Sequence, residues 1–271
     1  MSDRLLKFWR DWRGLLVFFA VMILFRSAVA DWNQVPSGSM KPGILDGDRI
    51  VVDKLAWDLR VPFTTVRVAD WADPARGDVV TFDNPVDGRL FIKRVVAVPG
   101  DRVEWNRNRL MINGEAAGYA PLDDGEIGAL PIEDTGRHRF YRESVLGTTR
   151  VVMLDGRPGA QDPHEVILSR LLGPPTRNCE RYVGRAAGAA SLAKAICRCA
   201  DLGACSTFPA FTVPEGKYWM MGDNRDNSSD SRVIGFVDRR SIYGRAHAVA
   251  FSVDTENYYR PRFGRFFTGL Q

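Results

Sequence analysis

Histidine is scarce in this chain: only His138, His164 and His247 occur among its 271 residues. None of the three lies in a setting typical of a Ser-His-Asp triad. This shortage argues against histidine as the base for a nucleophilic serine and leaves an unprotonated lysine as the alternative. The composition is otherwise that of a folded protein, with 45% hydrophobic and 26% charged residues.

Cysteine is also sparse and confined to one region. The four positions are Cys179, Cys197, Cys199 and Cys205. An even, clustered set predicts disulfides if the chain enters an oxidising compartment, although the sequence does not select the pairing. Free thiols and a zinc site are the alternatives. Zinc is disfavoured because four-cysteine sites usually use two Cys-x2-Cys pairs, which this chain lacks.

A strong charge of one sign is missing from most of the chain. The net charge is +4, but residues 1–30 hold five Lys or Arg against two Asp, a net +3, which leaves +1 for residues 31–271. A nucleic-acid-binding protein would carry its positive charge on the folded body. The sequence therefore predicts no nucleic-acid partner.

Long apolar runs are absent except near the N-terminus. Residues 14–25 contain no polar side chain, Arg26 interrupts the run, and residues 27–30 extend it. We predict a transmembrane anchor over residues 14–30, near the lower limit of about 17 residues. The basic residues before it predict a cytoplasmic N-terminus (1–13), with residues from 31 onward outside the cytoplasm. A buried core helix and a cleavable signal peptide ending at Ala30 are the alternatives.

Beyond residue 30 the pattern is typical of a β-rich protein. Predicted strands cover residues 48–53, 78–82, 90–98, 102–105, 109–112, 217–221, 235–237 and 246–253. Much of the middle of the chain carries residues typical of loops. It also contains an alanine-rich stretch over 186–200, which predicts a short helix. The predicted order after the anchor is a catalytic core (31–101 and 211–257), an inserted subdomain (102–210) and a basic-aromatic tail (258–271).

Three short segments suggest chemistry. Ser39 lies in Val-Pro-Ser-Gly-Ser-Met, and Lys93 lies inside a predicted strand, where burial would lower its pKa and free its amine. The dense polar run Gly222–Arg232 follows an apolar strand and lacks the glycine and glutamate of a calcium-binding EF-hand loop. Each segment alone fits an ordinary loop or strand, but a shared site explains all three.

Together these segments resemble those of bacterial type I signal peptidases. The matching residues are 36–42 with 47–50, 76–80, 91–94 through 99–101, and 222–232 with 235–236, in the order of that family. The resemblance implies a signal-peptidase-like β catalytic core, a Ser/Lys dyad, no metal and no organic cofactor. It also implies removal of signal peptides from exported preproteins at the outer face of the cytoplasmic membrane, with membrane lipids as further partners.

The resemblance assigns roles residue by residue. Ser39 corresponds to the nucleophile, Lys93 to the general base, and the Ser37 hydroxyl joins the Ser39 N–H in an oxyanion hole. The corresponding supporting residues are Ser228, which orients the lysine amine, and the ion pair of Asp230 and Arg232. The residues that correspond to the walls of the pockets for small P1 and P3 side chains are Val35, Pro36, Met40 and Ile92.

Two other functions fit parts of the sequence. A conjugative-transfer-type Ser/Lys peptidase would share the dyad but process a dedicated protein, and a membrane-tethered binding module would have no activity. The tail residues 258–267 interleave arginines with aromatics. They predict either a frayed, solvated terminus or a contact with the membrane interface.

Overall fold

The computed structural model describes residues 3–64, 66–106, 109–132, 135–155, 207–255 and 257–270. The four cysteines, the predicted helix over 186–200 and His164 lie outside these residues. The predictions made for them are therefore not addressed by the structure.

The described elements are mostly short strands. The helices are α1 (Asp3–Ala28), α2 (Asp124–Gly128) and α6 (Ser231–Ile234), with 3-10 turns η1 (Gly38–Met40), η2 (Thr135–Arg137), η3 (Arg225–Asn227), η4 (Arg239–Ser241) and η5 (Phe263–Arg265). The first strands are β1 (Ala30–Gln34), β2 (Asp48–Asp53), β3 (Asp58–Arg60), β4 (Arg67–Asp70), β5 (Val79–Asp83), β6 (Leu90–Ala97), β7 (Arg102–Asn106), β8 (Arg109–Ile112) and β9 (Glu115–Ala116). The remaining strands are β10 (Gly118–Pro121), β11 (His138–Val145), β12 (Thr148–Asp155), β13 (Thr207–Thr212), β14 (Lys217–Met221), β15 (Val237–Asp238), β16 (Ile242–Asp254), β17 (Arg260–Pro261) and β18 (Thr268–Gly269).

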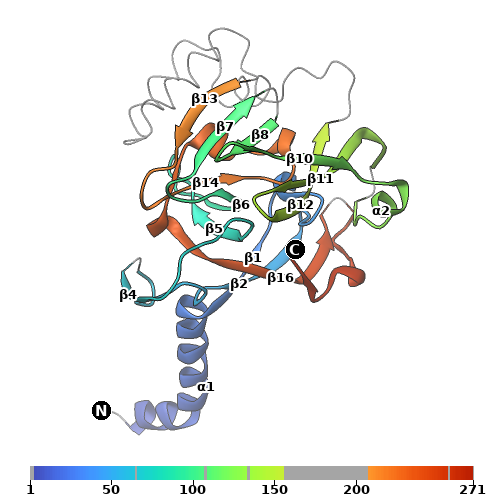
Figure 1. Cartoon of the computed structure of the whole chain (residues 1–271). Helices are drawn as coiled ribbons and strands as arrows, with labels where there is room; N and C mark the ends of the chain where they lie inside the picture. The colour runs from blue at the N-terminus through green and yellow to red at the C-terminus, as the bar shows by residue number, and fades with distance from the viewer. Residues whose placement is uncertain are drawn as a thin grey trace, which may run out of the picture.

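One antiparallel sheet of nine strands dominates the described part of the chain (Figure 1). Its main path runs β1-β2-β16-β5-β6-β14-β15, and β17 and β18 also pair with β16. The long strand β16 thereby joins the first strands of the chain to its C-terminal end. The prediction of a mainly β protein is confirmed, and most strands predicted from the sequence have a counterpart at nearly the same residues. The predicted strand 235–237 overlaps β15 only at Val237, and β16 begins at Ile242, four residues before its predicted start.

Strand β6 lies at the centre of the packing. Its residues Ile92, Val95 and Val96 belong to three different apolar clusters. Burial is therefore continuous along the strand from Ile92 to Ala97 instead of alternating. A lysine at position 93 of such a strand lies inside the protein, paired in register with Val80 of β5.

The other described strands form three smaller sheets. The orders of strands within them are β3-β4, β10-β11-β12 and β13-β7-β8-β9. The predicted hairpin over 102–112 is present as β7 and β8, which pair from Val103↔Ile112 to Asn106↔Arg109. Strand β13 returns from beyond residue 206 to pair with β7. The boundaries of the inserted subdomain, 102–210, stay a prediction.

The predicted transmembrane anchor is not supported. A helix is present as α1, and Figure 1 shows it extending away from the β body. Among the residues that the structure describes, however, no helix carries a stretch long and apolar enough to cross a membrane. The physical reason is the short apolar run: residues 14–25 end at Arg26, and twelve helical residues span only about 18 Å against roughly 30 Å of hydrocarbon.

The C-terminal tail is folded, so the prediction of a frayed terminus is wrong. Strands β17 and β18 pair with β16. Arg265 is buried and bonds Asp48 of β2, with 3.1 Å between Arg265 Nε and Asp48 Oδ1. The tail aromatics nevertheless face solvent, with Tyr258 94% and Phe267 85% exposed.

Candidate active site

Ser39 lies in the short 3-10 turn η1, immediately after an extended residue. Ser37 has φ −146° and ψ 152°, and the chain turns at Gly38. The turn buries both Ser39 and Met40, with Ser39 only 6% exposed. Met40 packs in the apolar cluster below, so burial of one side chain fixes the position of the hydroxyl beside it.

Lys93 meets Ser39 from strand β6. Its amine nitrogen lies 2.6 Å from Ser39 Oγ and 2.9 Å from the Ile92 carbonyl oxygen. The same nitrogen is 5.2 Å from the centre of the Phe91 ring, and the residue is 4% exposed. Two residues 54 positions apart in the chain thus share a hydrogen bond inside the protein.

Burial changes the protonation of this amine. Desolvation disfavours the charged ammonium and lowers the pKa of Lys93 from 10.5 to about 8. The negative charges of Asp230 and Asp223 act in the opposite direction and raise it, and the charge of Arg232 lowers it further. About a tenth of the amine is therefore free at pH 7, far more than for an ordinary lysine, and a general base requires this neutral form.

The polar run Gly222–Arg232 forms the third side of the site. Arg232 donates two hydrogen bonds to Asp230, each 2.8 Å long, and Gly222 N–H donates a third to Asp230 Oδ2 at 2.9 Å. Burial alone would raise the pKa of Asp230, but the charge and hydrogen bonds of Arg232 lower it. Asp230 therefore stays ionised and links Gly222 and Arg232, the two ends of the loop, by hydrogen bonds.

Gly222 allows this loop to approach the serine closely. A Cβ atom at this position would collide with the Ser228 hydroxyl and lie 2.5 Å from the Ser39 carbonyl oxygen. Asn224 then donates from its backbone N–H to the Ser39 carbonyl (3.1 Å) and from its side-chain amide to the Gly38 carbonyl (3.0 Å). Loop and serine turn are thereby held together through the backbone.

Two of the predicted supporting serines are near the pair but bonded differently from expectation. The exposed Ser37 donates to Ser39 Oγ at a long 3.4 Å. Ser228 is 1% exposed, and within the described part of the chain its hydroxyl has no hydrogen-bond partner. No hydrogen bond joins Ser228 to Lys93 in this structure; the amine bonds Ser39 and Ile92 instead.

The predicted pocket residues divide into two groups. Val35, Met40 and Ile92 are buried in one apolar cluster. Pro36 is exposed instead. The structure therefore brings three of the four together directly beneath Ser39.

Sequence reasoning missed Asn224 and Glu143, which lie behind the serine. Asn224 was inside a recognised motif but had no assigned role, and Glu143 belongs to an ordinary strand pattern with no motif around it. Histidine plays no part in the contacts of Ser39: among the described residues, His247 pairs with Asp53, and Ser39 Oγ bonds only Lys93 and Ser37. No group of three or more His, Cys, Asp or Glu within those residues is placed to hold a metal.

Comparison with known proteins identifies the family of this chain. The family described as "Signal peptidase, peptidase S26" matches residues 9–251. Signal peptidase I of Pseudomonas aeruginosa is 32% identical over 262 residues, covering 92% of this chain and 74% of that protein. Signal peptidase I of Pseudomonas fluorescens is 33% identical with the same coverage. A crystal structure of a signal peptidase I from Enterococcus faecalis aligns with 64% of this chain and 97% of that chain, at 22% identity and a TM-score of 0.29, too low to carry an argument.

These findings define the class and then the family. The chain is a serine endopeptidase. It belongs to the signal peptidase family, peptidase S26.

Proposed function

We propose that this peptidase removes N-terminal signal peptides from exported preproteins with Ser39 as nucleophile and Lys93 as general base. The observation that carries the proposal is the 2.6 Å contact between Lys93 Nζ and Ser39 Oγ inside the protein. A serine hydroxyl needs a neighbouring base, and a lysine whose pKa burial lowers to about 8 can serve as one.

The proposed reaction begins when neutral Lys93 accepts the proton of Ser39 as Oγ attacks the scissile carbonyl carbon. The oxyanion that forms accepts hydrogen bonds from the Ser39 N–H and, after a small rotation, from the Ser37 hydroxyl. The Lys93 ammonium then protonates the departing amine, and the signal peptide stays bound as an ester of Ser39. Lys93 next takes a proton from water as that water attacks the ester. The Lys93 ammonium then returns the proton to Ser39 Oγ as the signal peptide leaves with a free carboxyl terminus.

Ser228 and Asp230 support the base in this proposal. The buried Ser228 hydroxyl lies in the loop that Asp230 and Arg232 hold together. A hydroxyl at that place can accept a hydrogen bond from the amine while Lys93 shuttles its proton. Asp230 raises the pKa of Lys93, so it favours the ammonium form that must protonate the leaving group.

We infer the substrate preference from the apolar cluster beneath Ser39. Val35, Met40 and Ile92 would form shallow walls that accept an alanine at P1 and another small residue at P3 but exclude large side chains. Replacing the P1 alanine of a peptide substrate by phenylalanine should nearly abolish cleavage. Equal kcat/KM values for the two peptides would reject this pocket.

We also propose that α1 contacts membrane lipids at the face of the cytoplasmic membrane where the exported preproteins emerge. Its apolar side chains are exposed around the whole helix, for example Val17 at 58%, Phe18 at 56% and Val21 at 59%. A helix that is apolar all round is normally covered by protein or lipid. Flotation of the full-length chain with lipid vesicles, compared with a chain that lacks α1, measures this contact.

The decisive experiment for the dyad uses the detergent-solubilised chain and a preprotein, with mass spectrometry of the products. Ser39→Ala and Lys93→Ala should each abolish cleavage after a small residue, and the double variant should be no worse than either single variant, because the two groups act as a unit. Lys93→Arg should also be inactive, since arginine stays protonated. Appreciable turnover by Lys93→Arg would exclude lysine as the base.

A further inference from the structure

The serine turn is held from behind by the loop that carries Asn224. The two Asn224 hydrogen bonds fix the carbonyls of Gly38 and Ser39, one in the Gly38–Ser39 peptide that leads into the nucleophile and one in the peptide that follows it. The backbone N–H of Ser39, the proposed oxyanion donor, belongs to that same peptide. Any displacement of Asn224 therefore moves both the nucleophile and the donor.

The loop in turn rests on the three-stranded sheet β10-β11-β12, which carries no motif of the active site. Met153 of β12 donates its backbone N–H to the Asp223 carbonyl at 2.9 Å, and Met153 and Asn224 form a parallel β-bridge. From the opposite side, Arg94 of β6 donates to the Asp223 carboxylate at 2.9 Å and 2.7 Å. The residue before Asn224 is thus clamped between two sheets.

A buried carboxylate completes this contact. Glu143 of β11 is 0% exposed and accepts hydrogen bonds from Arg225 Nη1 (2.5 Å) and Nη2 (2.7 Å). Arg150 of β12 also donates to Glu143 Oε1. Arg225 directly follows Asn224 in the loop, and its carbonyl accepts a 2.6 Å hydrogen bond from Arg232.

Charge makes this contact sensitive to a single change. Arg225 and Arg150 are 2% and 6% exposed, and both direct their guanidinium groups at the same carboxylate. Without that negative charge, two buried cations would face each other across the contact between sheet and loop. Buried like charges repel strongly where water is excluded, so the loop would move away from the sheet.

We propose that Glu143 and Asn224 are positioning residues for the reaction, and that the β10-β11-β12 sheet holds the nucleophile turn in place through them. Glu143 acts on Arg225, Arg225 places Asn224, and Asn224 fixes the Gly38–Ser39 peptide. None of these groups touches the substrate in this proposal. The inference rests on the proposed Ser39 and Lys93 dyad.

The test uses the full-length chain in detergent micelles with a peptide that carries a small-x-small cleavage site. The variants are Glu143→Gln, which keeps the shape and removes the charge, and Asn224→Ala, which removes only the bond to Gly38. Both should lower kcat between about tenfold and a hundredfold, since small misplacement of a reacting group has effects of this size. KM should change by less than about threefold, because substrate contacts stay intact. The pH midpoint of kcat for Asn224→Ala should stay where it is in the wild type, because Lys93 keeps its surroundings.

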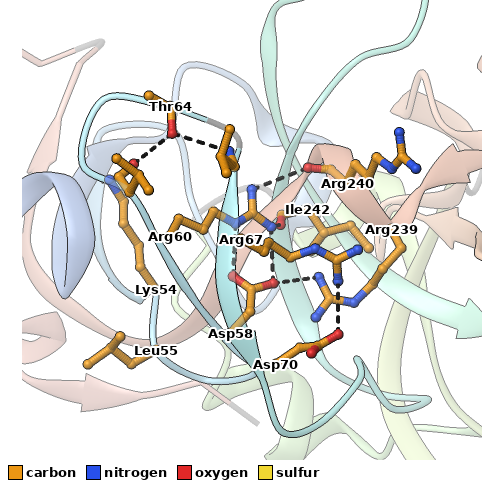
Figure 2. Close-up of polar contacts among 12 residues, drawn as sticks. Lys54, Leu55, Asp58, Arg60, Thr64, Arg67, Asp70, Arg239, Arg240 and Ile242 are labelled. Atoms are coloured by element: carbon orange, nitrogen blue, oxygen red, sulfur yellow. Dashed lines mark hydrogen bonds and ion pairs between the residues drawn. The ribbon is translucent and has the colours of Figure 1, made fainter.

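The chain offers a matched control at the base of the β3–β4 hairpin. There Asp58, 2% exposed, likewise lies between two arginines: it accepts a hydrogen bond from Arg60 Nε at 2.8 Å and forms an ion pair with Arg239 Nη1 at 2.9 Å. Figure 2 shows Asp58 between these two arginines. Asp58→Asn likewise removes the carboxylate between two buried arginines, although Arg239 Nε keeps its 2.7 Å bond to Asp73.

Asp58→Asn should lower the melting temperature as Glu143→Gln does, yet keep kcat within about twofold of the wild type. The inference is overturned if folded Glu143→Gln also keeps the kcat of the wild type. It is equally overturned if Asp58→Asn lowers kcat as much as Glu143→Gln does. Should Glu143→Gln fail to fold, Asn224→Ala decides: an unchanged kcat refutes the positioning role. Ser39→Ala is measured alongside, because residual activity there would refute the dyad itself and this inference with it.

Discussion

Replacing Lys93 by methionine should abolish cleavage and, at neutral pH, make the protein more stable. Methionine matches the length and apolar stem of lysine but carries no charge, so it can fill the space between Ser39 and the Phe91 ring without desolvating an ammonium. The proposed role of Lys93 as the base would explain why a lysine stands at this buried position.

The magnitude follows from the pKa of Lys93. In the unfolded chain the amine has its ordinary pKa of 10.5, and burial lowers the pKa to about 8 in the folded state. The folded state therefore binds fewer protons than the unfolded state between these two values, and stability rises with pH across this window. Below pH 8 the buried amine destabilises the fold by about 3 kcal/mol relative to high pH. Loss of the hydrogen bond to Ser39 offsets roughly 1 kcal/mol of the gain at every pH.

Urea unfolding of both proteins at several pH values measures this difference. The methionine variant should exceed the wild type by about 2 kcal/mol at pH 7. The advantage should shrink steadily between pH 8 and 10.5, where Lys93 is neutral in a growing share of unfolded molecules. In the wild type, kcat/KM should rise through an apparent pKa near 8, the value for the buried amine.

A constant stability difference from pH 7 to pH 10.5 would refute this reasoning, because it would mean that Lys93 titrates alike in folded and unfolded chains. The variant Lys54→Met is a control for the general effect of replacing a lysine by methionine, since the Lys54 side chain is partly exposed. A rate that follows a group near pH 6.5 and disappears with a histidine substitution would assign the base to histidine.

Three further predictions follow from the described contacts. Gly222→Ala should lower kcat, and it should lower the free energy of unfolding by about 1–3 kcal/mol, because the new Cβ would lie 2.5 Å from the Ser39 carbonyl oxygen. Steady-state kinetics measure the first effect and thermal unfolding the second. Burial would raise the pKa of Glu143, but the charges of Arg225 and Arg150 hold this pKa at about 2. The stabilisation that the charged Glu143 provides should therefore be present above pH 4.5 and be lost as the pH falls toward 2. The difference in free energy of unfolding between the wild type and Glu143→Gln should accordingly become smaller in acid. Serine substitutions of the exposed tail aromatics, Tyr258 and Phe267, should weaken binding to anionic vesicles in flotation assays without lowering the melting temperature, and unchanged binding would exclude the tail as a membrane contact.

Much of the fold could be predicted from local pattern. The β-branched run of β2 and the long apolar strand β6 carry their periodicity in neighbouring residues, so their positions followed from the sequence. The folded structure of the tail could not be predicted in this way. It depends on pairing with β16 and on the buried contact between Arg265 and Asp48, which lie 217 positions apart. The predicted anchor is not supported in the described part of the chain, because residues on both sides of Arg26 were counted as one span although the uninterrupted apolar run is short.

The sequence by itself determined the chemistry available to this protein: a serine and a lysine in distinctive segments, few histidines, and a polar loop after an apolar strand. Those features lie in short stretches, and short stretches are what a sequence displays directly. Only the tertiary structure decided that Lys93 is buried within 2.6 Å of Ser39, because burial and pKa depend on atoms from distant strands. It alone also placed Glu143 behind the site, since a buried carboxylate has no local pattern to mark it and its role comes entirely from the arginines that fold against it.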